Sequence, residues 1–145
     1  MQSQFPPGYL RDLYYEGLTP IVSLSSNVKI PDNSGTSIPL LRGKTMQWLL
    51  NLSSGNITKI FLKLGTCGRF NHCQLVLSIL PEQNQTPVAR AILDGTTAQD
   101  NQWTEFVFDH PIEPGKYRCQ LQSPDADDHN TLFLWLTVAK PGLVY

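Results

Sequence analysis

The side chains with the most reactive chemistry gather in the segment LGTCGRFNHCQLVLSIL, which runs from Leu64 to Leu80. It contains Cys67, His72 and Cys73, and thiols and imidazoles are the groups that bind zinc or act as nucleophile and base. A structural zinc site has four such ligands, usually in close pairs. These residues lack that pairing and no second pair follows, so the segment does not predict a zinc site.

A thiol nucleophile needs a histidine close to it in space. His72, His110 and His129 all fall at expected strand ends or in loops, so the sequence is compatible with a Cys–His pair. We interpret the segment first as a glycine-bearing turn that positions Arg69 and Asn71. No paired carboxylates stand out for a common cleft, and we therefore expect a module without a catalytic set.

The acidic run DADDHN is the second group with possible chemistry. Asp125, Asp127 and Asp128 carry the hard oxygen ligands that calcium prefers. The run lacks the glycine and the distal glutamate of a calcium-loop motif. A solvated acidic turn is the favoured interpretation, structural calcium is the alternative, and we expect no cofactor.

Composition narrows the possible partners of the chain. Of its 145 residues only 16% are charged, and the formal net charge is −1. Nucleic-acid binding needs a strong basic field, which this balance does not provide. No apolar run approaches the length of a membrane span, and the start MQSQFPPGYL lacks the features of a signal peptide.

Three cysteines leave one unpaired and favour reduced thiols. We expect a soluble, cytoplasmic protein.

The reactive groups must be positioned by strands, because hydrophobic residues alternate with polar ones along most of the chain. Turn-forming runs such as PDNSG, SSGN and PEQNQTP separate these segments. The one candidate for a short helix lies near Leu10–Leu18. The expected strands are Pro20–Ser25, Thr45–Asn51, Thr58–Leu64, Cys73–Leu80, Val88–Leu93, Gln102–Asp109, Lys116–Gln122 and Thr131–Val138.

This pattern predicts an all-β fold, an antiparallel β-sandwich of the jelly-roll type with about eight strands. A closed barrel is the alternative. We expect the sandwich to span residues 20–139, with residues 1–19 as an N-terminal extension that packs on it and residues 140–145 as a tail or linker.

Alternation also assigns side chains to faces of the sheets. Cys73 and Cys119 fall on core-facing positions and are expected to be small buried hydrophobes. Trp48 is expected to pack, and the same is the default for Trp103. In the last strand the aliphatic row from Leu132 to Val138 faces the core.

Phe133 and Trp135 then lie on the outer face of the last strand. Aromatic rings on a sheet, with amides and guanidinium groups nearby, suit sugar binding. Trp103, Arg118 and Gln120 are candidates for the rest of that surface, together with Gln122. Alternatively, the aromatic N-terminal segment covers the same face and turns it into a second small core.

The order of several short motifs carries a resemblance. The segment LGTCGRFNHCQLVLSIL, followed by DNQWTEFVFDHPIEPGKYRCQLQSPDADDHNTLFLW, resembles the β-sandwich accessory modules joined to bacterial, often cyanobacterial, glycosyltransferases. Those modules show GTYGR-N-C-L-L-L, then DN-W-F-F-PI, then Y-R-L-SPDA-N-TLW, and the match covers about Lys44 to Leu136. The matching residues are Gly65, Gly68, Arg69, Asn71, Asp100, Asn101, Trp103, Ser123, Pro124, Asp125 and Trp135.

The resemblance implies a jelly-roll module that assists sugar transfer by holding a glycan or orienting a neighbouring glycosyltransferase domain. Cys67 stands where the pattern has an aromatic residue, so a ligand contact made by that ring is missing or replaced. The alternative function is a protein-interaction or spacer domain that docks on a partner or forms a homodimer. The glycan candidates are Trp135, Phe133, Trp103, Arg69, Asn71, Asn101, Arg118 and Gln120.

Overall fold

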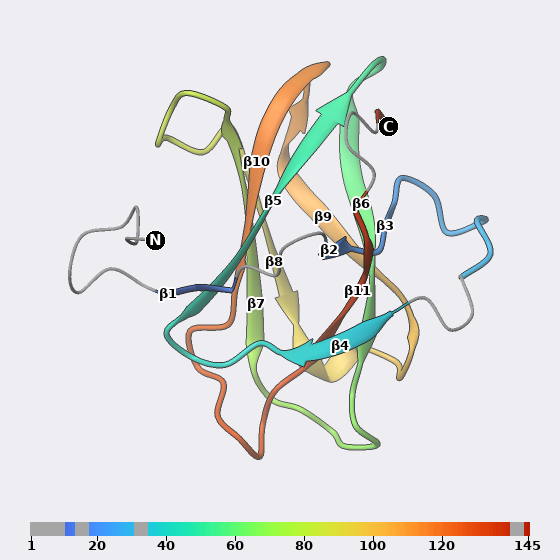
Figure 1. Ribbon diagram of the computed structural model, residues 1–145, viewed down its shortest axis with the longest axis vertical. Coiled ribbons are helices and arrows are strands. Elements are labelled where there is room, and N and C mark those ends of the chain that lie inside the picture. Colours follow the sequence, from blue (N-terminus) through green and yellow to red (C-terminus); the bar gives the residue numbers. More distant parts are fainter. Residues whose placement is uncertain (1–10, 14–17, 31–34, 140–143) are drawn as a thin grey trace.

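The computed structural model describes residues 11–13, 18–30, 35–139 and 144–145. Within these ranges the chain forms two layers of β-strands that face each other (Figure 1). The only helical element there is the single 3₁₀ turn η1 (Gly95–Thr97). None of the described helices is long and apolar enough to span a bilayer. The predicted all-β sandwich is therefore confirmed.

The first layer, called sheet A here, has the strand order β1-β5-β10-β7-β8. Its pairs are antiparallel except for β1 with β5, which is parallel. The strands are β1 (Arg11–Leu13), β5 (Lys44–Leu52), β7 (Gln74–Pro81), β8 (Ala89–Asp94) and β10 (Gly115–Gln122).

The second layer, sheet B, is centred on β6 and β11, and all its pairs are antiparallel. β9 lies on one side of β6, and on the other side β11 and β3 pair with successive parts of that strand. The strands are β2 (Leu18–Pro20), β3 (Val22–Ser23), β4 (Thr36–Pro39), β6 (Ile57–Gly65), β9 (Gln102–Ile112) and β11 (Phe133–Val138).

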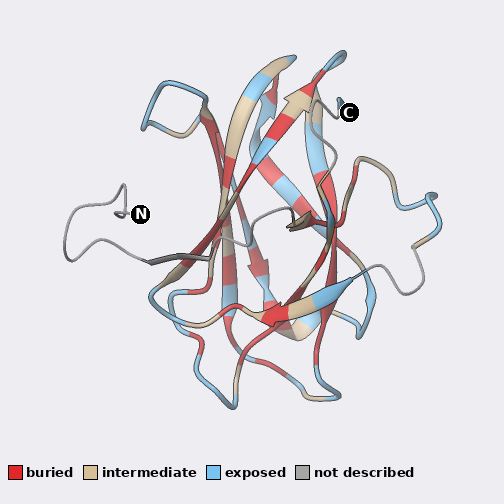
Figure 2. Cartoon of the chain, viewed as in Figure 1, coloured by how far each residue is buried: buried red, intermediate tan, exposed pale blue. Residues whose placement is uncertain are grey.

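The core consists of the aliphatic and aromatic rows that the two sheets turn toward each other. Figure 2 shows buried and exposed residues alternating along β8 and β9, as expected for strands with one face in the core. Fully buried members on different strands pack in this one cluster. They include Leu50, Ile60, Leu62, Leu64, Cys73, Leu75, Leu77, Ile79, Cys119, Leu121, Leu132, Leu134 and Leu136.

Seven of the eight expected strands each coincide with one observed strand, and Pro20–Ser25 overlaps the end of β2 and all of β3. The described part of the chain has eleven strands rather than about eight. The additional ones are short and lack the long alternation that sequence reading depends on. The short helix expected near Leu10–Leu18 is wrong for Arg11–Leu13, which form β1 and pair with β5. The expected burial of Val138 is also wrong, because this side chain at the end of β11 is exposed.

The two ends of the chain attach to the sandwich at separate places. β1 lies on the edge of sheet A, whereas β2 pairs with β11 in sheet B. At the other end, the N–H of Tyr145 donates to the carbonyl of Asn51 at 2.8 Å, and the N–H of Ser53 donates back to Tyr145 at 2.9 Å. The predicted packing of residues 1–10 and the linker role of residues 140–143 lie outside the described residues.

Neighbouring leucines on β5 provide a test of the inside–outside assignment. Leu50 is fully buried, whereas Leu49 is 65% exposed. We expect Leu50→Ala to lower the free energy of unfolding by about 2–5 kcal/mol, because it leaves a cavity, and Leu49→Ala to change it by less than about 0.5 kcal/mol. Urea denaturation of both variants measures the difference, and equal effects would contradict the register of β5.

Candidate functional site

Arg69 and Asn71, two of the predicted glycan contacts, connect loops at one end of the sandwich. The amide of Asn71 donates to the carbonyl of Thr66 at 3.1 Å, and its Oδ1 accepts the N–H of Thr131 at 3.2 Å. Arg69 donates to the carbonyls of Asp128 at 3.2 Å and Thr131 at 3.3 Å. Asn71 is only 1% exposed. Both side chains therefore fasten the β6–β7 loop to the β10–β11 loop.

The acidic run, for which structural calcium is the alternative to a solvated turn, takes part in the same fastening. Asp125 Oδ1 accepts the N–H of Gln74 at 2.9 Å, and Asp127 Oδ1 accepts the N–H of His129 at 2.8 Å. Asp128 contributes its backbone carbonyl to Arg69. In the described ranges, no group of three or more histidine, cysteine or acidic residues has a metal-binding arrangement. The run forms a hydrogen-bonded turn.

The thiols of the opening segment have different surroundings. Cys73 and Cys119 are buried, as expected, and Cys67 is exposed. Burial raises the pKa of both buried thiols, and a hydrogen bond with Ser123 partly offsets the shift at Cys73. These two residues are core-packing groups, because a raised pKa disfavours the thiolate needed for nucleophilic attack.

The outer face of sheet B carries a row of three side chains from three strands. Lys63 on β6 is the register partner of Trp103 on β9, so their side chains project from the same face. On the other side, Lys63 Nζ lies 4.5 Å from the centre of the Trp135 ring on β11. We call Trp135, Lys63 and Trp103 the Trp–Lys–Trp row. Both tryptophans are partly exposed.

The indole ring of Trp135 is held by residues in the loop after η1. Its Nε1–H donates to Asn101 Oδ1 at 2.8 Å, and the backbone N–H of Asn101 donates to Leu64 at 2.8 Å. Gly65 lies beside this contact, where an added Cβ would be 3.2 Å from Asn101 Oδ1 and 3.4 Å from Trp135 Nε1. The Asn101 predicted as a glycan contact therefore orients Trp135.

Trp103 is held by the segment that follows β3. Its Nε1–H donates to the carbonyl of Val28 at 2.7 Å. Both indole N–H groups of the row thus have acceptors within the protein, which fixes the planes of the rings. Phe133 lies on the same outer face of β11 as Trp135 and is also partly exposed.

A second pair of outward residues lies beside the row, on β6 and β9. Lys59 and Glu105 form an ion pair at 3.1 Å, and Lys59 Nζ lies 5.8 Å from the centre of the Phe61 ring. Phe61 is on an outward position yet is only 6% exposed. Part of the outer face is therefore packed rather than open. Of the residues 1–17 expected to cover it, only β1 is described, and it pairs in sheet A.

Arg118 and Gln120 belong to β10, in the opposite sheet. They are partly exposed on the outer face of sheet A, where Gln120 is the register partner of Gln47 and Ser78. Arg118 donates to the carbonyl of Asn84 at 3.1 Å. The structure therefore does not bring these two residues onto one face with Trp103, Phe133 and Trp135. Alternation alone cannot reveal this separation, since both sheets have outer faces.

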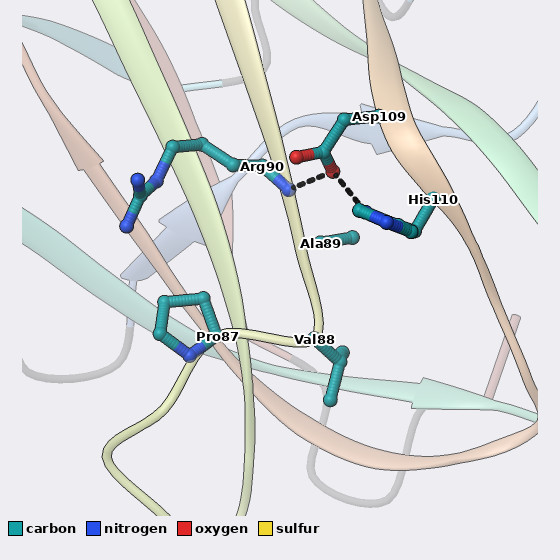
Figure 3. A pocket seen from close by; sticks show the side chains of 6 residues that line it. All are labelled: Pro87, Val88, Ala89, Arg90, Asp109 and His110. Carbon is teal, nitrogen blue, oxygen red and sulfur yellow. Dashed lines mark hydrogen bonds and ion pairs between the residues drawn. The ribbon is translucent and has the colours of Figure 1, made fainter.

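A shallow, open depression of about 350 Å³ lies between the beginning of β8 and the end of β9 (Figure 3). Asp109 accepts the N–H of Arg90 at 2.8 Å and lies 3.2 Å from His110 Nδ1. The hydrogen bond from Arg90 lowers the pKa of Asp109. Sequence reasoning did not select this place. The Asp109 carboxylate accepts the N–H of Arg90 at the beginning of β8, which is an edge strand. This N–H is then not available to pair with a strand of another chain.

Lys63 is the member of the row that sequence reasoning did not select. The pattern KIFLKL places it on the outer face but does not show which side chains of β9 and β11 lie beside it. That information depends on register, which long-range pairing sets.

In comparisons with family models, curated proteins and solved structures, no significant match to this chain was found.

The buried amide of Asn71 supports a prediction about the loop network. Asn71→Ala leaves the N–H of Thr131 and the carbonyl of Thr66 without these partners, so we expect the free energy of unfolding to fall by about 1–3 kcal/mol. The matched control is Asn84→Ala, at an exposed turn. Thermal and urea denaturation measure both. An unchanged stability of the Asn71 variant would mean that the amide does not hold the loops together.

Proposed function

We propose that this chain is a non-catalytic carbohydrate-binding module that assists a glycosyltransferase, and that it holds glycan on the outer face of sheet B. The observation that carries the proposal is the Trp–Lys–Trp row, in which two oriented, partly exposed indoles flank one ammonium group. The order of motifs that resembles glycosyltransferase-associated modules supports the accessory role.

The row has the properties that sugar binding requires. The apolar face of a pyranose packs on an aromatic ring, while its hydroxyls need directional hydrogen-bond partners. The indole N–H groups of Trp103 and Trp135 are bonded to Val28 and Asn101, so the rings are oriented before ligand arrives. Such preorganisation lowers the entropic cost of binding. Lys63 adds a donor beside the rings.

Arg69 and Asn71 have a supporting role in this proposal, because their hydrogen bonds lie within the loop network. Those loops lead from β6 and into β11, the two strands that carry Lys63 and Trp135. Arg118 and Gln120 lie on the other sheet and are not part of the proposed face. The module therefore uses one face of one sheet.

Removing either ring should weaken glycan binding. We expect Trp103→Ala to weaken it by roughly tenfold or more, because a stacked ring contributes about 1–3 kcal/mol in comparable aromatic contacts. Trp135→Ala should weaken it as well, because Lys63 then loses the ring over which its ammonium lies. The measurement is a calorimetric titration with a panel of soluble neutral and acidic bacterial polysaccharides. The control is Phe70→Ala, which removes a ring that is 72% exposed on the β6–β7 loop.

The variants must first match the unmodified chain in circular dichroism, so that lost binding is not lost folding. The proposal fails if the folded, unmodified chain binds none of the polysaccharides. It also fails if sedimentation shows self-association that sugar does not affect and that Trp135→Ala abolishes. That second result would support the protein-interaction alternative.

A further inference from the structure

Lys63 is a largely covered lysine that forms no ion pair with the described residues. The residue is only 8% exposed, although it lies on the outer face of β6. Its Nζ contacts the ring of Trp135, at 4.5 Å from the ring centre. Among the residues that the structure describes, no carboxylate forms an ion pair with it. An ammonium that is partly shielded from water is stabilised by a nearby anion.

The carboxylates near the row in sequence or register have other partners. Glu105, two residues beyond Trp103 on β9, is paired with Lys59 at 3.1 Å. Asp100, beside Asn101, accepts the N–H of Thr66 at 2.7 Å. The cation–π contact with Trp135 stabilises the Lys63 ammonium only in part. The row therefore has one ammonium group that forms no ion pair with a described carboxylate.

We propose that the Trp–Lys–Trp row selects acidic sugars, in which a carboxylate on the pyranose ring supplies the missing partner of Lys63. This inference rests on the proposed function and adds the class of ligand. Trp103 offers the ring on which the sugar stacks, and Trp135 keeps the ammonium in place beside it. A uronic acid carries its carboxylate at the edge of the pyranose, so stacking directs this group sideways, toward the neighbouring strand.

The geometry of the sheet makes both contacts possible in one sugar unit. Trp103 and Lys63 are register partners on adjacent strands, and adjacent strands lie about 4.8 Å apart. Lys63 Nζ lies toward Trp135, so the carboxylate of a sugar stacked on Trp103 has to extend across β6 to reach it. A charge-assisted hydrogen bond from a partly desolvated ammonium is stronger than one from a neutral donor, so a neutral sugar of the same shape binds less well.

The test uses matched probes that differ only in charge. Oligomers of polygalacturonate, alginate and glucuronan are each compared with the same oligomer after reduction of its carboxylates to primary alcohols. We expect the unmodified chain to bind at least one acidic oligomer about tenfold more tightly than its reduced form. Increasing salt should narrow the difference, because exposed parts of the contact are screened.

Three variants test whether Lys63 causes the preference for the acidic oligomer. Lys63→Met keeps the length and apolar stem of the side chain and should weaken binding of the acidic form much more than binding of the reduced form, so that the preference is lost. Lys63→Arg keeps the charge and should retain a preference. Lys59→Met is the matched control, since this lysine is on the same strand and face but is already paired with Glu105, and it should leave the preference unchanged.

The possible failures separate this inference from the proposed function. Equal binding of acidic and reduced oligomers by the unmodified chain overturns the inference and leaves the glycan-binding role intact. A preference that persists in folded Lys63→Met, or that is lost in Lys59→Met, also overturns it. If no oligomer or polysaccharide binds at all, the proposed function itself is wrong, and the inference falls with it.

Discussion

Burial of two facing rows of apolar side chains is the constraint on which the rest of this structure depends. Strands such as β6 and β7 place every second residue in the core, where Ile60, Leu62, Leu75 and Leu77 are fully buried. Since the side-chain period of a strand is two, this burial also fixes which residues point outward. The outer face of sheet B is therefore a direct consequence of the way the core is packed.

The residues that carry the family resemblance have largely structural positions. Asn71, Arg69 and Asp125 bond backbone groups of neighbouring loops, and Asn101 orients Trp135. Polar groups at such loops need partners because an unpaired buried donor or acceptor is costly. Polar residues at such positions can thus serve the architecture of the loops without touching a ligand.

The proposed function depends on a juxtaposition of three strands. Lys63 and Trp103 meet through the pairing of β6 with β9, and Trp135 approaches from β11 on the other side. Each ring is oriented by one hydrogen bond to a residue outside its own strand, Val28 or Asn101. The row is therefore only as rigid as the loops that supply these acceptors. One of these loops is tied to the β6–β7 loop, because Asp100, beside Asn101, accepts the N–H of Thr66.

Alternation in the sequence predicts eight strand segments, most of the inward rows and the burial of Cys73 and Cys119, because it is a local signal that needs no knowledge of partners. It also indicated that Phe133 and Trp135 face outward. The placement of Arg118 and Gln120 on the opposite sheet, and of Lys63 between two tryptophans, depends on how distant strands pair. Pairing partners and register arise from contacts between distant segments, and a single strand's pattern does not contain them.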